Sequence, residues 1–340
     1  MKNNDFPRHL TSFLSQYLPG EKNVSTHTIT SYRDTFKLFL IFCEKEKGLF
    51  PEKLAMKLIT KELVVGFLDW IEKERKSSIS TRNQRLAALH SFFRYIQKEC
   101  PENLYEIQKI LSIPSKKKIK PMIPYLTGNE MKILLEQPDV STKAGLRDLV
   151  LMAVLYDTAA RVQELVDLRL KGIRLSDPAV ITLHGKGQKT RQVPIMGKTK
   201  ALLENYVDKR KVITGIAQLE NLLFVNQKHQ KLSRWGISHI ISKYVQMARQ
   251  NPGFTVSFPV TPHVFRHSKA MHLLQSGVCL IYIRDFLGHS DCSTTEVYAR
   301  ADSEMKRKAI ENAYQDLIPE GLPKWEEDGG LMKWLNSICE

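Results

Sequence analysis

An imidazole and a guanidinium lie three residues apart where the sequence predicts the start of a helix. Thr261 is a good N-cap residue and Pro262 suits the first helical position, so a helix is expected to begin here. His263 and Arg266 then share one face near the helix N-terminus, where free N–H groups attract an anion. The pair indicates an anion-binding site, although a solvated His and Arg would show the same spacing.

A histidine and a tyrosine follow at a second helix boundary. An apolar stripe at helical spacing consists of Leu280, Ile283 and Leu287. It stops at Gly288, a typical helix-ending residue, so His289 lies just beyond the helix. Ser293 and Glu296 then form a capping box that places Tyr298 early in the next helix. A lone tyrosine in such a position is commonly a packing residue, so the assignment depends on its neighbours.

Two further cationic side chains come earlier in the chain. Arg161 begins the amphipathic segment 162–168, and Lys186 lies at the tip of a predicted hairpin. Each is a weak signal alone. The fixed N–H donors of arginine match the non-bridging oxygens of a phosphate in a way that lysine cannot copy. Together with Arg266, Arg161 therefore points to a phosphate ligand.

The ordered set Arg161, Lys186, His263, Arg266, His289 and Tyr298 resembles the tyrosine recombinase, or phage integrase, family. The resemblance covers residues 126–314, and the N-terminal helices look like the family's core-binding domain with less specific motifs. The motifs are Ala-Arg-x-x-Glu-Leu (160–165), Gly-Lys-Gly-x-Lys-x-Arg (185–191), Thr-Pro-His-x-x-Arg-His (261–267), Leu-Gly-His (287–289) and Thr-Thr-x-x-Tyr (294–298).

The resemblance implies cleavage of a DNA phosphodiester bond through a 3′-phosphotyrosyl link to Tyr298. A phenol is a better leaving group than an alkoxide, so the link conserves the bond energy for rejoining. Arg161 and Arg266 would bind the developing charge on the phosphoryl oxygens.

The resemblance also assigns the proton transfers and the supporting contacts. His263 would act as the general acid/base, and Lys186 would protonate the departing 5′-oxygen. His289 would donate a hydrogen bond to the phosphate, and Glu164 would support the site from behind. The plainer alternative for Glu164 is a carboxylate on a helix surface.

One position departs from the family pattern. The turn before the first arginine usually carries a glycine, whereas this chain has Ala159. Alanine tolerates a positive φ poorly, so we expect the backbone leading into Arg161 to differ.

We expect neither a metal nor a cofactor. The motifs hold no cluster of Asp and Glu of the two-metal type, and the arginines supply the positive charge that Mg²⁺ supplies elsewhere. The glycine turn 185–187 lies between predicted strands, which is the wrong context for nucleotide binding.

The expected fold is mainly α, with a helical core-binding domain and an α-rich catalytic domain that contains a small antiparallel β-sheet. The predicted parts are a DNA-clamping domain (1–115), a basic linker (116–124), a catalytic domain (125–318) and a tail (319–340). Residues 179–184 and 190–195 are predicted strands, and Thr127 with Glu130 forms a capping box that opens a helix. Three amphipathic helices are expected in the first hundred residues, with apolar faces that begin at Ile29, Leu63 and Leu86.

Basic side chains in the N-terminal half are candidates for DNA contacts. These are Arg82, Arg85, Lys116, Lys117, Lys118 and Lys120. For the two arginines a solvated helix face is the plainer alternative, and for the lysines a solvated tether is equally consistent. The overall formal charge is +15, from 51 Lys+Arg against 36 Asp+Glu, which attracts polyanions.

The cysteines and the apolar runs of the sequence indicate the cellular compartment. Five scattered cysteines with no Cys-x-x-Cys pair argue against disulfides or a zinc site, and no apolar run is long enough to span a bilayer. We expect a cytoplasmic protein.

We therefore expect a site-specific DNA recombinase that acts on duplex DNA with paired sites as a homotetramer, or mixed with related recombinases. The expected biological setting is the integration or transposition of a mobile element. A type IB topoisomerase and a non-catalytic DNA-binding regulator are the alternatives. Leu331, Trp334, Leu335 and Ile338 fall on one helical face of the tail, which is expected to dock either on its own domain or on a neighbouring protomer.

Overall fold

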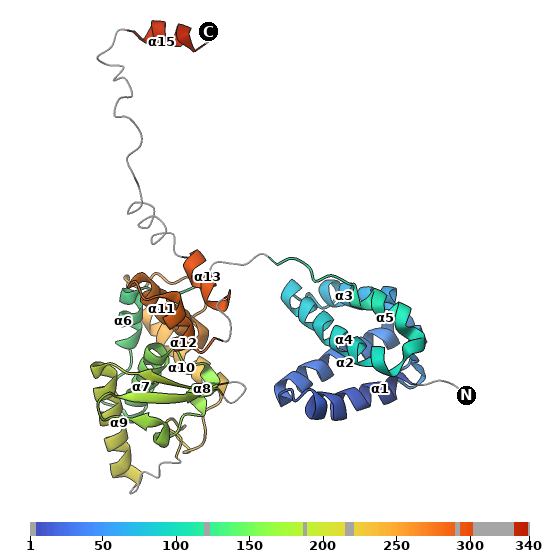
Figure 1. Cartoon of the computed structure of the whole chain (residues 1–340). Helices are drawn as coiled ribbons and strands as arrows, with labels where there is room; N and C mark the ends of the chain where they lie inside the picture. The colour runs from blue at the N-terminus through green and yellow to red at the C-terminus, as the bar shows by residue number, and fades with distance from the viewer. Residues whose placement is uncertain are drawn as a thin grey trace. The chain divides into compact units, whose positions relative to one another are not determined.

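The chain divides into two compact units in a computed structural model, and each unit is described here by itself (Figure 1). The first unit is Met1–Pro121 and the second is Met122–Glu340. The structure describes residues 5–118, 123–185, 189–214, 221–289, 293–301 and 330–338. The division falls inside the predicted linker 116–124, while the exact domain limits stay a prediction.

The described part of the N-terminal unit is built from helices. They are α1 (Phe6–Ser12), a π-helix (Phe13–Glu21), α2 (Thr26–Lys47), α3 (Lys61–Lys73), α4 (Ile79–Glu99) and α5 (Leu104–Leu111), with short 3₁₀ turns at Pro51–Lys53, Met56–Leu58 and Pro101–Asn103. The three amphipathic helices expected from the sequence correspond to α2, α3 and α4.

Capping and apolar periodicity explain the positions of these helices. The hydroxyls of Ser25, Thr60 and Ser78 each accept a hydrogen bond from a backbone N–H in the first turn of α2, α3 and α4. The predicted apolar face of α2 turns inward, because Phe36 and Phe39 are almost fully buried in the core of this unit. Burial of such aromatic side chains supplies most of the stability of a helix in a small domain.

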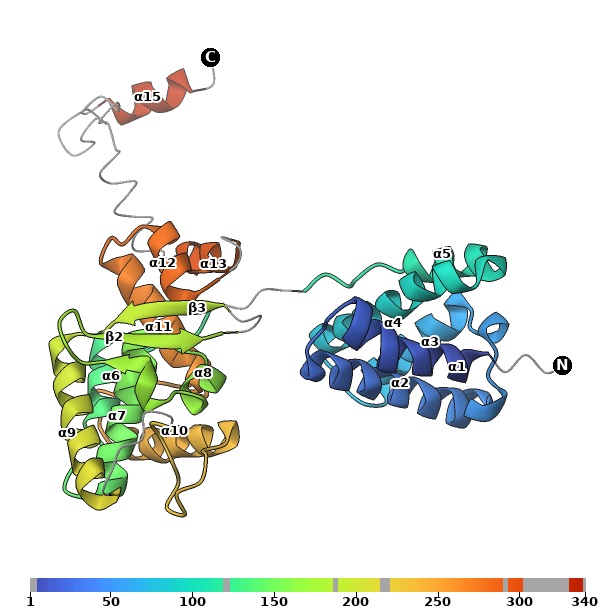
Figure 2. The same ribbon diagram turned by 60° about the horizontal axis from the view of Figure 1, so that its bottom comes forward.

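The C-terminal unit is also mainly helical (Figure 2). Its helices are α6 (Gly128–Leu135), α7 (Lys143–Thr158), α8 (Val162–Val166), α9 (Gly197–Thr214), α10 (Arg234–Ala248), α11 (Pro262–Gln275), α12 (Leu280–Leu287), α13 (Ser293–Ala301) and α15 (Leu331–Ser337), with a 3₁₀ turn at Leu170–Gly172. The predicted capping box of α6 is present, since Thr127 Oγ1 accepts from Glu130 N at 3.2 Å and Glu130 Oε2 accepts from Thr127 N at 2.9 Å.

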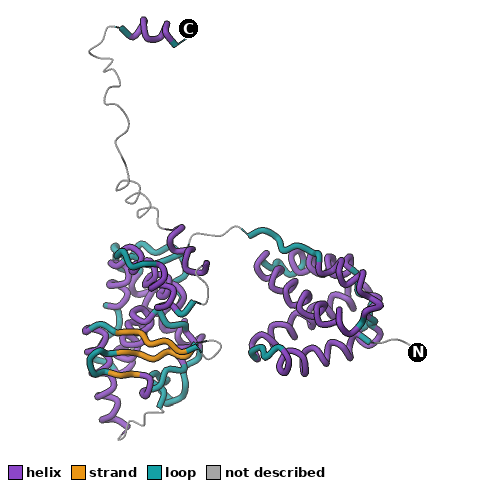
Figure 3. The backbone as a smooth tube through the Cα atoms, viewed as in Figure 1, coloured by secondary structure: helices purple, strands orange, loops and turns teal. Residues whose placement is uncertain are grey.

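One small antiparallel sheet interrupts the helices of the C-terminal unit. Its strands are β1 (Ile173–Arg174), β2 (Val180–His184) and β3 (Thr190–Pro194), in the order β1-β2-β3, with Ile181 opposite Val193. Figure 3 shows strands in this unit alone among the described residues. The predicted hairpin is confirmed as β2 and β3. The sequence did not predict β1, because two residues carry no periodicity.

The core of the C-terminal unit surrounds α7. Its side chains Val150, Leu151 and Val154 are fully buried, and the helix packs against both α9 and α11. Helices α11, α12 and α13 contact one another, so the three motifs that they carry lie close together in space (Figure 1). Across the described ranges, no helix combines the length and apolar character needed to cross a membrane.

The mainly α fold with a small antiparallel sheet is therefore the predicted one. The sequence places α13 one residue late, because Ser293 is inside the helix rather than its N-cap. Differences of this size are common at helix ends.

Candidate active site

A cavity of about 610 Å³ in the C-terminal unit is lined by two of the predicted site residues, Arg161 and His289. Its lining consists of Arg161, Gly185, Lys189, Thr190, Arg191, Asp285, Gly288, His289 and Thr294. These residues come from the start of α8, from both sides of the β2–β3 turn, from the end of α12 and from α13. Four of them are cationic or imidazole side chains, so the cavity suits an anion.

Glu164 lies behind this cavity and holds two arginines in place. Its carboxylate accepts two hydrogen bonds from Arg191, at 2.9 and 2.8 Å. It accepts two more from Arg161, from the backbone N and from Nη1, both at 2.8 Å. Burial alone would raise the pKa of Glu164, but the hydrogen bonds and charges of Arg191 and Arg161 outweigh it and lower the pKa. The carboxylate therefore stays ionised and orients both guanidinium groups.

The turn before Arg161 adopts a conformation that the sequence did not lead us to expect. Ala159 has φ +47° and ψ +36°, in the left-handed region that alanine disfavours. The expectation that alanine would avoid a positive φ here is wrong. Ala159 is fully buried, and its carbonyl accepts a hydrogen bond from Arg266 Nη1 at 2.7 Å. Tertiary contacts of this kind outweigh a local cost of about 1–2 kcal/mol.

Arg266 connects two parts of the site. Its guanidinium is 3% exposed and donates to Ala159 O at 2.7 Å and to Leu287 O at 2.5 Å. Burial, followed by the positive charges of Arg161 and Arg191, lowers the pKa of Arg266 to about 10, so the group is still protonated at neutral pH. Arg266 thereby fixes the turn before Arg161 and the end of α12 relative to each other.

The end of α12 brings His289 to the cavity. Gly288 has φ +63°, as predicted for a helix-ending residue, and a Cβ there would lie 3.1 Å from Arg191 Cδ. Arg161 Nη2 donates to the Gly288 carbonyl at 3.2 Å. His289 Nδ1 lies 3.0 Å from Thr295 Oγ1. Burial, together with the positive charges of the neighbouring arginines, lowers the pKa of His289 to about 4, so its ring is neutral at pH 7.

Tyr298 lies in a small apolar cluster beside the cavity. The cluster consists of Ala159, Ala270, Met271, Leu274, Ile283, Leu287 and Tyr298. The tyrosine is 2% exposed, and its hydroxyl lies 2.9 Å from Nδ1 of His267. His263, one turn earlier on α11, is exposed, and its ring lies 6.3 Å from that of His267 between centroids. Arg266 donates to the carbonyls of Ala159 and Leu287, two members of this cluster that lie within two residues of Arg161 and Gly288 at the cavity.

Some predicted residues lie outside the described part of the chain. Lys186 and Lys120 are among them, although Gly185 and Lys189, on either side of the hairpin tip, line the cavity. The predicted Ser293 capping box also rests on a side chain that is not described.

The basic residues of the N-terminal unit differ in their accessibility. Arg82 is 4% exposed and pairs with Glu72 at 3.2 Å. Arg85 donates to Ser31 O and Thr35 Oγ1, both at 3.0 Å. A DNA contact by either arginine would require these partners to be exchanged, and it stays a prediction.

The three described linker lysines, Lys116, Lys117 and Lys118, are exposed. Lys116 pairs with Glu72 at 2.6 Å, and its backbone exchanges two hydrogen bonds with the Asn83 side chain. The start of the linker is therefore fixed to α4, and Lys117 and Lys118 lie just beyond that anchor.

Two residues of the site received no role from the sequence. Arg191 and His267 are the last residues of the 185–191 and 261–267 motifs, so they were visible in the pattern. Their partners, Glu164 and Tyr298, lie 27 and 31 residues away along the chain. Separations of that size are set by tertiary packing and cannot be read from local spacing.

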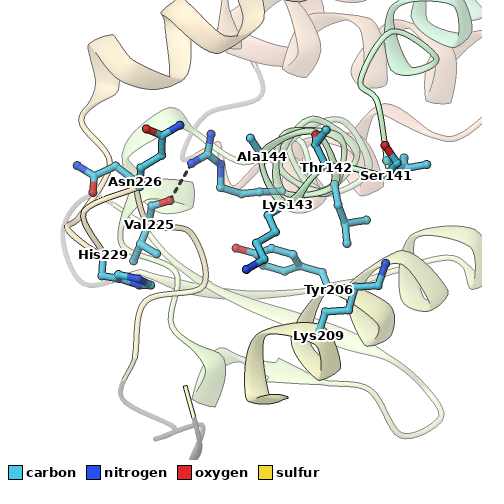
Figure 4. Close-up of a pocket in the computed structure, with 13 residues that line it drawn as sticks. Ser141, Thr142, Lys143, Ala144, Tyr206, Lys209, Val225, Asn226 and His229 are labelled. Atoms are coloured by element: carbon cyan, nitrogen blue, oxygen red, sulfur yellow. Dashed lines mark hydrogen bonds between the residues drawn. The ribbon is translucent and has the colours of Figure 1, made fainter. Parts of the chain in front are cut away.

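A second cavity, of about 420 Å³, lies at the start of α7 and holds none of the predicted site residues. Figure 4 shows Tyr206 and Lys209 of α9 facing Lys143, with Val225, Asn226 and His229 on the other side. This cavity is not part of the site described above. Within the described residues, no group of three or more His, Cys, Asp and Glu side chains is placed to hold a metal ion.

Comparison with known proteins gives the class of this fold and site. Residues 124–305 match the phage integrase family, and residues 10–99 match the family's N-terminal SAM-like domain. The chain is 35% identical over 329 residues to a putative integrase/recombinase, y4rC, of Sinorhizobium fredii, covering 97% of each chain. It is 30% identical to the tyrosine recombinase XerC of Bacillus subtilis, over 93% of this chain and 98% of that protein.

A solved structure has the same fold. The XerH site-specific recombinase, crystallised with a palindromic difH substrate, superposes with a TM-score of 0.68 at 23% identity, over 88% of this chain and 84% of that one. The chain therefore belongs to the phage integrase family and is a tyrosine-type site-specific DNA recombinase.

Proposed function

We propose that this recombinase cleaves and rejoins duplex DNA through a 3′-phosphotyrosyl intermediate on Tyr298. The observation that carries the proposal is the single cluster formed by Arg161, Arg191 and His289 around one cavity, with Arg266 connecting it to the cluster that contains Tyr298. Such a cavity suits a phosphate, and a phenol beside it suits attack on phosphorus.

The proposed reaction uses each group for one purpose. Arg161 is 35% exposed and oriented by Glu164, so its outer N–H groups can bind a non-bridging oxygen. His289 is neutral, and if Nδ1 accepts from Thr295, its Nε2–H is available to donate to the phosphate. Because Tyr298 is buried, its hydroxyl must become accessible to the phosphate before it can attack.

The departing 5′-oxygen needs a proton. By resemblance, Lys186 supplies it from the tip of the β2–β3 hairpin. The hairpin residues Gly185 and Lys189 lie at the cavity, which supports this assignment. On rejoining, the 5′-hydroxyl attacks the phosphotyrosine and the phenol leaves, so no nucleotide is consumed.

The proposed substrate is double-stranded DNA that the two units clamp. The +15 formal charge and the exposed Lys117 and Lys118 support a contact with the phosphate backbone. XerH, which shares the fold, was crystallised on DNA. By the same resemblance the active assembly is a homotetramer on paired sites, or a mixed one with related recombinases.

The experiment that tests this function begins with a pool of random-sequence duplexes. Sequences bound by the protein are selected, and two copies of the selected site are placed on one supercoiled plasmid. A recombinase deletes or inverts the DNA between the sites. Relaxation without exchange would indicate a topoisomerase, and binding without any strand cleavage would indicate a regulator.

We also propose that the biological reaction is the integration or transposition of a mobile element. The tail beyond residue 318 and the likeness to an integrase/recombinase support this setting. When the two copies of the selected site are placed on separate plasmids, the expected product is a single molecule in which the two plasmids are joined. Deletion between directly repeated sites with no joining would instead favour resolution of dimers.

The tail is proposed to dock on a neighbouring protomer. Residues 331–337 form α15, and Trp334, Leu335 and Ile338 are 45%, 45% and 58% exposed. So short an apolar helix is not stable in water alone. Cutting the chain after Ile318 should leave single-site binding intact and abolish assembly of paired sites, as gel-shift assays with one and two sites will show. Unfolding of the truncated chain would assign the helix to its own domain.

A further inference from the structure

The contact between His267 and Tyr298 has no place in the mechanism above. Nδ1 of His267 lies 2.9 Å from the hydroxyl oxygen of Tyr298, and the two rings are 5.7 Å apart between centroids. As far as the structure describes the chain, the Tyr298 hydroxyl has a hydrogen bond to His267 and none to His263. A general base must be within hydrogen-bonding reach of the proton that it takes, and His267 meets this condition.

The surroundings determine which of the two groups carries the proton at rest. Burial, then repulsion between the protonated rings of His267 and His263 and the charge of Arg266, lower the pKa of His267 to about 4, so its ring is neutral at pH 7. Burial raises the pKa of Tyr298, so the phenol keeps its proton. The phenol is therefore the donor and Nδ1 the acceptor, which leaves the hydrogen of the neutral ring on Nε2.

We propose that His267 receives the hydroxyl proton of Tyr298 during attack on phosphorus, a role that the resemblance gives to His263. The proposal rests on the proposed phosphotyrosyl reaction. As the Tyr298 oxygen–phosphorus bond forms and the bond from phosphorus to the 5′-oxygen breaks, the phenolic proton moves to Nδ1 of His267. The leaving 5′-oxygen takes a separate proton, assigned to Lys186. On rejoining, the phosphotyrosine bond breaks and His267 returns the proton to the phenol.

A weak base is sufficient for this step. The phenol becomes much more acidic as its oxygen bonds to phosphorus, so proton transfer is favourable once attack is under way. The bound phosphate also brings negative charge next to Arg266 and His267, which favours the protonated imidazole. In the free enzyme, burial keeps the phenol of Tyr298 protonated.

The test separates activation of the nucleophile from protonation of the leaving group. The substrate is a nicked duplex of the selected site whose 5′-bridging oxygen is sulfur, because a thiolate leaves without a proton. His267→Asn places an amide oxygen near the position of Nδ1, so it keeps a hydrogen-bond acceptor but cannot carry the proton. We expect this variant to form the covalent adduct about 100-fold more slowly or worse, with a rate that rises with pH as hydroxide replaces the base.

A matched control is present on the same helix. His272 also has its Nδ1 against a tyrosine hydroxyl, 2.8 Å from that of Tyr156, outside the cavity. His272→Asn should therefore leave the rate of adduct formation within a few-fold of the native rate. His263→Asn, tested on the same sulfur substrate, should lose less than His267→Asn.

Three results would overturn the proposal. A near-native rate for His267→Asn would show that the contact is structural, and a faster rate would show that it only restrains Tyr298. A larger loss in His263→Asn would return the role to His263. Failure of the proposed function looks different, because the native protein would then form no adduct on Tyr298.

A measurement on the native protein covers the case in which His267→Asn does not fold. ¹⁵N chemical shifts of the free enzyme should show the His267 ring neutral, with Nδ1 bare and the hydrogen on Nε2. A hydrogen on Nδ1 would prevent that atom from accepting the Tyr298 proton and would contradict the assignment.

Discussion

Replacement of Glu164 by glutamine should destabilise the C-terminal unit and weaken cleavage together. The carboxylate is 4% exposed and accepts four hydrogen bonds, two from Arg191 and two from Arg161. Glutamine keeps the shape but offers one oxygen, and its NH₂ group would face guanidinium donors. The variant thus leaves two positive groups facing each other behind the cavity.

The expected loss of unfolding free energy in this variant follows from how deeply Arg161 and Arg191 are buried. Removing one member of a buried ion pair costs about 3–5 kcal/mol. Arg191 is 12% exposed, but Arg161 is 35% exposed and can recover some hydration, so the lower end of this range applies. We expect the free energy of unfolding to fall by about 3 kcal/mol, which corresponds to roughly 6–12 °C in Tm for a unit of this size.

Denaturant and thermal unfolding of Glu164→Gln will measure this loss. The control is Glu136→Gln on the same unit, where the carboxylate is 59% exposed and 4.0 Å from Lys132, and a change within about 0.5 kcal/mol is expected. If Glu164→Gln changes the unfolding free energy no more than the control does, the carboxylate does not hold the two arginines and the reasoning fails.

Three other outcomes are expected. Arg161→Lys and Arg266→Lys should each lose most cleavage despite the retained charge, because lysine cannot donate two hydrogen bonds in a fixed plane; near-native rates of adduct formation would refute this. Lys186→Ala should cleave ordinary DNA poorly and recover on the substrate with a 5′-bridging sulfur, and absence of rescue would limit Lys186 to charge stabilisation. Since the folded-state pKa values of His267 and His289 are lowered to about 4, the unfolded chain binds more protons below about pH 6.5. Stability should therefore fall from pH 7 to pH 5, by roughly 1–2 kcal/mol after allowance for solvent screening, and denaturant unfolding that shows no fall would contradict these pKa shifts.

Much of the fold follows from local chemistry that is visible in the sequence. The capping box at Thr127 and the apolar face of α2 with Phe36 correctly predicted helices, and the β-branched, apolar run around Ile181 predicted a strand. Gly288 correctly predicted a left-handed helix end. These signals depend on neighbours within a few residues, so one sequence is enough to reveal them.

Ala159 shows where local reasoning fails. Its intrinsic preference opposes a positive φ, yet the residue adopts one, with its carbonyl bound to Arg266, 107 residues later in the chain. The partners of Arg191 and His267 were missed for the same reason, because both contacts join separate elements. Local preferences of about 1–2 kcal/mol are smaller than the tertiary contacts that decide such positions.

The basic residues of the N-terminal unit illustrate a second limit. Spacing placed Arg82 and Arg85 on one face of α4, but it could not show that Glu72 and Thr35 pair with them inside the unit. A charged residue on a helix face can remain at the surface or pack against other residues of its unit. Which of these occurs depends on its neighbours in space, which the spacing along the chain does not show.

The most direct test of the central claim identifies the amino acid that becomes linked to DNA. The protein is incubated with the selected duplex, the covalent complex is digested, and the peptide that carries the nucleotide is sequenced by mass spectrometry, in parallel with Tyr298→Phe. We predict a 3′-phosphate linked to Tyr298 in the native protein, and normal DNA binding without any adduct in the variant. A covalent adduct formed by Tyr298→Phe, or one attached to another residue of the native chain, would contradict the account.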